Sequence, residues 1–116
     1  MSLFIITYHY VRPLKNSKYP NLKALELKKF KEQINILKKN TTILKIDDLS
    51  QVNLNKKKNF SLLTFDDGYL DHYKHVYPIL KKHNIYASFF IPIKNLISKD
   101  ILSVNKIHFI LEKFYG

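Results

Sequence analysis

Residues 60–69 of this 116-residue chain read FSLLTFDDGY, an apolar run followed at once by two aspartates, a glycine and a tyrosine. A short apolar run bounded by turn residues is typical of a buried β-strand. Two carboxylates at the end of such a strand are costly to desolvate unless a cation or a proton neutralises them. Gly68 is one of two glycines in the chain, and glycine readily adopts the backbone angles of a sharp turn. The sequence therefore predicts a strand over 60–65 that carries Asp66 and Asp67 to a cleft at its C-terminal end.

Two interpretations of the aspartate pair are open from the spacing alone. In the first, one aspartate binds a divalent metal ion and the other accepts a proton from a metal-bound water. In the second, the pair is structural, with one aspartate capping the following helix and Asp71 assisting at the N-terminus of that helix. A cap accounts for one carboxylate but not for two in succession.

The segment TFDDGY at 64–69 resembles the first signature of the polysaccharide deacetylase family, the metal-dependent carbohydrate esterases with a NodB homology domain. Other segments resemble further parts of that domain in the same order: YHYVR at 8–12, FKEQINILKK at 30–39, PILKK at 78–82 and ASFFI at 87–91. The resemblance runs through most of the chain, and the six-residue signature is its most specific part.

This resemblance implies an α/β fold, a partial distorted (β/α) barrel in which parallel strands alternate with helices. It implies hydrolytic removal of N-acetyl groups from an amino-sugar polysaccharide or oligosaccharide, assisted by a divalent metal ion, usually zinc. Asp66 matches the catalytic base of the family, and Asp67 matches its metal-ligating aspartate.

Histidine spacing departs from the family pattern. The family completes its metal site with a His-Ser/Thr-x-x-His motif, but no two histidines of this chain lie four apart; they are His9, His72, His75, His83 and His108. We therefore expect an incomplete metal site and an inactive chain, with a non-catalytic fragment that binds a glycan or a partner chain as the alternative function.

The roles of individual histidines are predicted from their positions. Active sites of parallel sheets lie at the C-terminal ends of the strands, and His9 follows the first predicted strand. His9 is accordingly a candidate substrate contact, with a hydrogen-bonded structural histidine as an equal alternative. His72 and His75 are predicted to be surface histidines, with a substitute metal site as the less favoured alternative.

Three tyrosines follow the aspartates at four-residue spacing: Tyr69, Tyr73 and Tyr77. This spacing places side chains on one face of a helix. It predicts a packed aromatic stripe in preference to a platform for sugar rings.

Hydrophobic periodicity divides the chain into alternating strands and helices, which predicts a parallel sheet. Strands are expected at 3–7, 42–46, 60–65 and 86–91, and helices at 25–39 and around 107–114; 47–51 is a short helix or turn, 53–59 a loop, and 94–103 irregular or weakly helical. The strands at 3–7 and 86–91 are expected to be fully buried. The helix after the aspartates is expected to be interrupted at Pro78, which lacks a backbone donor.

Chain length bears on domain organisation. A full (β/α) barrel typically needs about 200 residues or more, so residues 1–116 are expected to form a truncated N-terminal half of the domain, with a complete small α/β domain as the less favoured alternative. The open sheet edge of such a half would favour self-association or pairing with a missing C-terminal half.

Composition excludes several classes of function. The net charge is +11, yet Arg12 is the only arginine among 20 basic residues, whereas specific nucleic-acid recognition favours the bidentate arginine fork. No sequence-specific nucleic-acid binding is therefore expected. The chain has no cysteine, no run of transmembrane length and no signal-peptide pattern, so the cytoplasm is the expected compartment.

Overall fold

The computed structural model describes residues 2–53 and 57–115. Its elements in chain order are β1 (Leu3–Tyr8), β2 (Val11–Arg12), β3 (Leu25–Glu26), α1 (Leu27–Asn40), β4 (Thr42–Leu44), η1 (Ile46–Gln51), β5 (Phe60–Asp66), η2 (His72–Val76), α2 (Tyr77–Lys82), β6 (Ser88–Phe90), α3 (Ile93–Ser98) and α4 (Ser103–Tyr115). Every predicted strand is present, each within a few residues of its expected bounds. Of the loop predicted over 53–59, residues 54–56 lie outside the described part of the chain.

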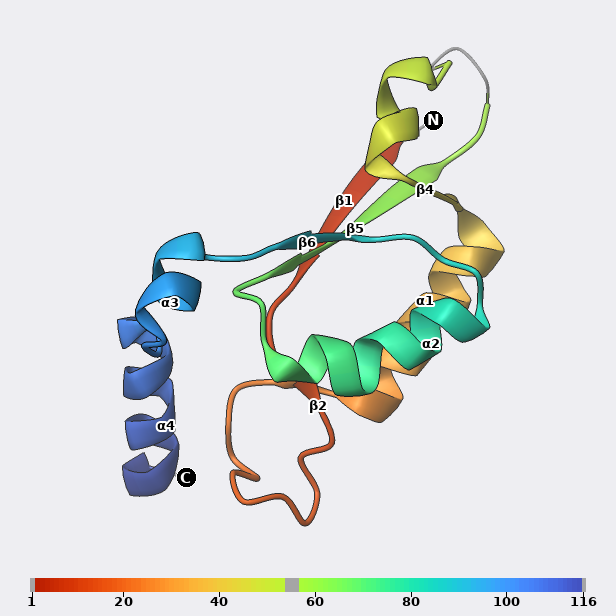
Figure 1. The fold of residues 1–116 in the computed structure, drawn as a ribbon. Helices are drawn as coiled ribbons and strands as arrows, with labels where there is room; N and C mark the ends of the chain where they lie inside the picture. Colours follow the sequence, from red (N-terminus) through yellow and green to blue (C-terminus); the bar gives the residue numbers. More distant parts are fainter. Residues whose placement is uncertain (1, 54–56, 116) are drawn as a thin grey trace.

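A parallel sheet with β5 at its centre organises the fold (Figure 1). β1 pairs with β5 along its whole length, from Leu3 opposite Phe60 to Tyr8 opposite Phe65. The other edge of β5 is shared, because β4 pairs with its first part and β6 with its last part. All three pairings are parallel, as the sequence predicts, so the C-terminal ends of β1, β5 and β6 reach the same edge of the sheet.

Two helices, α1 and α2, cover one side of this sheet and form the core with it (Figure 1). The buried core residues are Tyr8, Val11, Phe30, Ile34, Leu63, Phe65, Val76 and Leu80. The pairs Phe30/Ile34 and Val76/Leu80 are each four residues apart and therefore share one helix face. Burial of each such side chain contributes about 1.5–3 kcal/mol, which fixes β5 and the turn that follows it.

The helix after the aspartates continues past the predicted interruption. Residues 70–82 are helical, but the middle of this segment is the π-helix η2, in which the Tyr77 N–H donates to the His72 carbonyl five residues earlier. Pro78 lies in the first turn of α2, where its missing N–H costs least. The proline is thus accommodated by a widened turn and not by a break.

Side-chain exposure differs from expectation at the sheet edges. Phe4 and Ile5 of β1 are 48% and 59% exposed, and Phe89 and Phe90 of β6 are 40% and 53% exposed. The prediction that these two strands are fully buried is therefore wrong. Within the described residues, β1 is paired along one edge only and β6 is three residues long, so neighbouring side chains cannot enclose them.

Several apolar side chains of α4 face solvent. Its apolar residues Ile107, Ile110 and Phe114 are 53%, 54% and 76% exposed, whereas Asn105 is buried against the rest of the protein. No helix within the described ranges is both long and apolar enough to cross a membrane.

Candidate functional site

The turn after β5 has an unusual backbone. Asp66 is the last residue of the strand, and both Asp67 and Gly68 have positive φ angles, of 73° and 61°. The sharp turn predicted at Gly68 is confirmed, and a Cβ there would lie only 3.2 Å from Ile91 Cγ2. Aspartate tolerates the left-handed region better than most residues, but the conformation still costs about 1–3 kcal/mol. Such strain is typical of functional sites.

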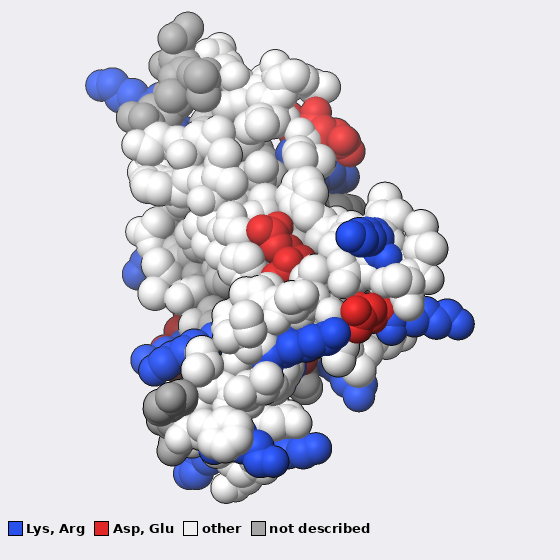
Figure 2. Space-filling model, turned by 90° about the vertical axis from the view of Figure 1, so that its left-hand side faces the viewer, with Lys and Arg blue, Asp and Glu red and all other residues white. Residues whose placement is uncertain are grey.

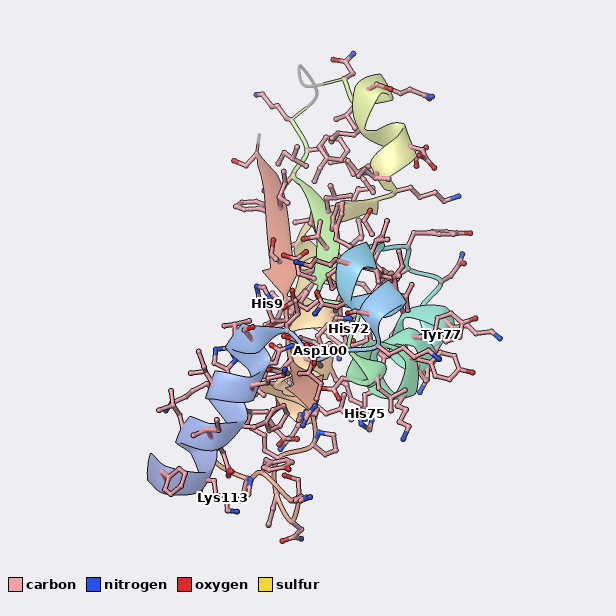
Figure 3. All side chains as sticks on the ribbon, turned by 60° about the vertical axis from the view of Figure 1, so that its left-hand side comes forward. His9, His72, His75, Tyr77, Asp100 and Lys113 are labelled. Carbon is pink, nitrogen blue, oxygen red and sulfur yellow. The ribbon has the colours of Figure 1, made fainter. Side chains whose placement is uncertain are left out.

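Asp67 is held by two neighbours. Its Oδ2 atom accepts a 2.8 Å hydrogen bond from the Tyr69 hydroxyl and lies 3.2 Å from His9 Nδ1. Figure 3 shows His9 at the end of β1, so parallel pairing of β1 with β5 brings it beside the aspartates, as predicted. The Asp67 side chain is 26% exposed and that of His9 is 56% exposed, so both remain accessible to a ligand.

His72 lies next to His9 (Figure 3) and contacts its backbone. It is 4% exposed, so its prediction as a surface histidine is wrong. Its ring packs 5.2 Å from Phe65, its Nε2–H donates to the His9 carbonyl, and its Nδ1 has no hydrogen-bond partner. Burial lowers its pKa, which keeps the ring neutral. The missed signal was its spacing of four residues from the core residue Val76.

A second set of side chains connects the site to α4. The rings of Tyr10 and Tyr69 stack with centroids 4.3 Å apart. Both hydroxyls lie close to Asn105 Oδ1, at 2.9 Å and 2.8 Å, and the Tyr10 hydroxyl also lies 3.2 Å from His108 Nδ1. Burial raises the pKa of each phenol, and the hydrogen bond to Asp67 raises that of Tyr69 further. Both tyrosines therefore remain protonated donors.

The predicted stripe of three tyrosines is wrong for Tyr69, which turns toward Asp67. Tyr73 and Tyr77 stack on each other with centroids 6.4 Å apart, and they are 72% and 48% exposed. Tyr69 is separated from the other two tyrosines because it follows the turn at Gly68 and precedes the first helical residue. It therefore does not share their helix face.

Asp71 makes an ion pair and no capping hydrogen bond. The Arg12 guanidinium binds it in a bidentate manner, with N–O distances of 2.7 and 2.9 Å. The same guanidinium lies 5.5 Å from the Tyr10 ring and 5.8 Å from the Phe109 ring. Arg12 thus ties β2, the helix after the aspartates and α4 together beneath the site.

The residues present do not complete a metal centre. A catalytic zinc site normally has three protein ligands, and the described part of the chain contains no cluster of three His, Cys, Asp or Glu side chains that could hold a metal ion. Asp67 and His9, whose side chains lie next to each other at the strand ends, are potential metal ligands.

Two hollows flank the site. One, of about 350 Å³, is lined by His9 and by polar side chains that include Thr7, Lys23 and Gln33. The other, of about 290 Å³, is lined mainly by aromatic residues that include Tyr69, Tyr73 and Phe89. The first hollow offers the mixture of donors and acceptors that a polar ligand requires.

Comparison with known proteins gives consistent results. Residues 53–106 match the sequence model of the family described as polysaccharide deacetylase. A stretch of 42 residues is 45% identical to the protein YxkH of Bacillus subtilis (strain 168), covering 36% of this chain and 15% of that protein.

Two solved structures share the fold and part of the sequence. The Streptococcus pyogenes deacetylase PplD, in complex with acetate, matches 77% of this chain with a TM-score of 0.59 and 26% identity. IcaB from Ammonifex degensii matches 78% of it with a TM-score of 0.57 and 28% identity. The matched region spans 42% and 40% of those two chains. Over residues 53–106 the chain is thus similar in sequence to the polysaccharide deacetylase family, and its fold matches part of the solved deacetylase structures.

Proposed function

We propose that this chain supplies the base and one metal-ligating carboxylate of a deacetylase site that removes N-acetyl groups from an amino-sugar polysaccharide or oligosaccharide. The observation that carries the proposal is the Asp66–Asp67 turn at the C-terminal end of the central strand, within the segment that matches the family. The acetate in the streptococcal relative is the product that such a reaction releases.

The two carboxylates have different surroundings, which supports different roles. Asp67 is engaged by Tyr69 and His9. Within residues 2–53 and 57–115, no side chain hydrogen bonds to the Asp66 carboxylate. A partly exposed carboxylate without a donor is suited to accept a proton, so Asp66 is the proposed base toward the attacking water.

The proposed cofactor is a divalent metal ion, zinc or a similar one, ligated by Asp67. Because the described residues provide no set of three ligands, the remaining ligands must come from outside them. We further propose that the 116-residue chain by itself is inactive and that the rest of a deacetylase domain, in the same chain or in a separate one, completes the site.

The glycan is proposed to approach along the hollow beside His9. Sugar hydroxyls and amides need both donors and acceptors, and Lys23, Gln33 and Thr7 provide them there. His9 is more than half exposed, which agrees with a contact to substrate. The competing function, glycan or partner binding without turnover, is favoured by one observation, the incomplete ligand set.

Acetate release from N-acetylglucosamine oligomers, with Zn²⁺ added, separates the two functions. We expect none from the chain alone, and release that depends on Asp66 once a C-terminal deacetylase segment from a relative is supplied. Acetate release by the chain alone that disappears in Asp66→Asn would contradict the incomplete site. Oligomer binding without release in every combination would favour the non-catalytic function.

A further inference from the structure

A further hollow, of about 350 Å³, lies between the loop after β2 and the start of the helix after β5 (Figure 1). The loop contributes residues that include Arg12, Ser17 and Lys18, and the helix contributes residues that include Lys74 and His75. The loop follows β1 and β2 in the chain, and β1 and β5 are parallel. The hollow therefore lies at the same end of the sheet as the candidate site, and the proposed reaction does not use it.

Hydrogen bonds hold the loop side of this hollow in place. The Leu14 N–H donates to the Glu26 carboxylate at 2.7 Å, and the Ser17 N–H donates to the Leu14 carbonyl at 3.0 Å. The Tyr19 N–H donates to Ser17 Oγ at 3.2 Å, and the Tyr19 ring packs 4.7 Å from the Phe109 ring of α4. The Ser17 hydroxyl accepts in this turn, so its own proton is left for a ligand. A wall fixed in this way loses little freedom when a ligand binds.

The charges around the hollow do not balance. Three cationic side chains and one carboxylate line it: Arg12, Lys18, Lys74 and Asp71. Both oxygens of Asp71 are bound by Arg12. Neither lysine forms an ion pair in the described part of the chain, and Lys18 Nζ lies over the Tyr19 ring, 5.4 Å from its centroid. Two positive charges at the hollow thus have no carboxylate among the described residues.

This arrangement suits a phosphate group. A phosphate monoester carries a charge of about −1.5 to −2 and three acceptor oxygens, which matches the two lysine charges, whereas a carboxylate carries one negative charge. Donors come from both sides: the Ser17 hydroxyl, Lys18 and Lys74 line the hollow together with Arg12, whose Nη1 edge Asp71 leaves free. A water molecule takes up about 30 Å³, and a phosphate only a few times as much. The hollow therefore has room for the molecule that carries the phosphate.

We propose that this hollow, called the anion pocket below, binds the phosphate group of a phosphorylated sugar unit in the glycan. Lys18 and Lys74 bind the phosphate from opposite sides, and Ser17 donates a hydrogen bond to it. The choice of a glycan rests on the proposed function, because the pocket lies at the end of the sheet where that function places its substrate. The charge and the donors of the pocket do not depend on that function.

The first test is an NMR titration of the isotope-labelled chain at physiological salt, which screens general charge attraction. N-acetylglucosamine 6-phosphate should shift the backbone amide signals of residues 12–19 and 70–75 in a saturable manner. Inorganic phosphate should shift the same signals with weaker affinity, and N-acetylglucosamine should leave them in place. A sugar phosphate that binds no more tightly than inorganic phosphate would overturn the inference, because the pocket would then recognise no sugar.

Charge-neutral variants test which lysines hold the phosphate. Lys18→Gln and Lys74→Gln each remove one ion pair with the ligand, and we expect each to lower the affinity about 5-fold, the upper end for a solvent-exposed pair. The double variant should lose more than either. Lys82→Gln is the matched control, since Lys82 is equally exposed on the same helical segment and does not line the pocket. An equal loss in Lys82→Gln would show attraction by total charge alone and overturn the inference. Circular dichroism verifies that each variant is folded.

Other anions in the same titration decide the kind of ligand. Glucuronate carries a carboxylate in place of the phosphate, and equal affinity for it would overturn the assignment to phosphate. Phosphatidylglycerol vesicles and a short single-stranded oligonucleotide present phosphate from a membrane and from a nucleic acid. Tighter binding of either one than of the sugar phosphate would overturn the assignment to a glycan.

These measurements need neither metal nor turnover, so they separate the pocket from the proposed function. If the chain joined to a complementing segment releases no acetate while the sugar phosphate binds as expected, the proposed function fails and the pocket stands. If acetate is released but the sugar phosphate shifts no pocket signal, the inference alone fails.

Discussion

The Nε2–H group of His72 donates a 2.8 Å hydrogen bond to the backbone carbonyl of His9, which lies 63 residues earlier in the chain. The bond joins the helix after the aspartates to the end of β1. It also fixes the backbone from which the His9 side chain reaches Asp67. The buried ring of His72 thus connects the core to the candidate site.

The first prediction concerns pH. Burial lowers the pKa of His72 from its ordinary value of 6.5, so below that pH the unfolded state binds a proton that the folded state resists. The free energy of unfolding should be fully retained above pH 6.5 and should fall as the pH drops below it. Urea denaturation between about pH 5 and 8 measures this. His72→Phe should flatten the dependence and His75→Phe should not; equal slopes in all three proteins would contradict the prediction.

A second prediction addresses Arg12 and Asp71. Removal of one partner from a largely buried ion pair leaves an uncompensated charge, which typically costs about 3–5 kcal/mol. Arg12→Ala should therefore lower the free energy of unfolding strongly, and Arg12→Lys should only partly restore it, because lysine lacks the bidentate fork. The exposed pair Lys106–Asp100 is the matched control, and Lys106→Ala should have little effect. If Arg12→Ala and Lys106→Ala lowered the free energy of unfolding by similar amounts, the prediction would be contradicted.

Metal binding provides the third prediction. With Asp67 and His9 as the two adjacent donors, the isolated chain should bind Zn²⁺ weakly, and calorimetry should detect no tight one-to-one complex. Tight binding that is lost in Asp67→Ala, yet retained when His72 and His75 are both changed, would reveal further ligands besides Asp67 and His9.

The fourth prediction concerns nucleic acids. Figure 2 shows basic side chains scattered over one face of the molecule with no single basic patch. Binding to DNA or RNA should therefore be non-specific and should collapse between low and physiological salt, since it depends on counterion release. Fluorescence anisotropy with two unrelated duplexes measures this. A complex that prefers one sequence and survives physiological salt would contradict the expectation.

The last prediction concerns the outward face of α4. Ile107, Ile110 and Phe114 are exposed apolar residues at helical spacing, and exposed apolar patches mark interaction surfaces. The purified chain should self-associate with rising concentration in sedimentation velocity. The double variant Ile110→Lys, Phe114→Lys should be monomeric, whereas Lys106→Gln on the same helix should behave as the original chain. A monodisperse monomer at high concentration would show that these residues do not drive association.

Local sequence patterns were sufficient for the elements and for the turn of the candidate site. Three predictions made from neighbouring residues are confirmed. They are the strand from the apolar run at 60–65, the helix from the spacing of Phe30 and Ile34, and the sharp turn at Gly68. Alternation of strands and helices also predicted the parallel sheet, and with it the approach of His9 to the aspartates.

The partners of the site residues were decided only by the tertiary structure. Tyr69 meets Asn105 across 36 residues, Arg12 meets Asp71 across 59, and His72 meets His9 across 63. Hydrophobic periodicity indicates which face of a helix or strand is buried. It does not indicate which distant polar group will contact a given side chain. The exposure of β1 likewise depends on strands that pair beside it, a property of the whole sheet and not of the strand's own residues.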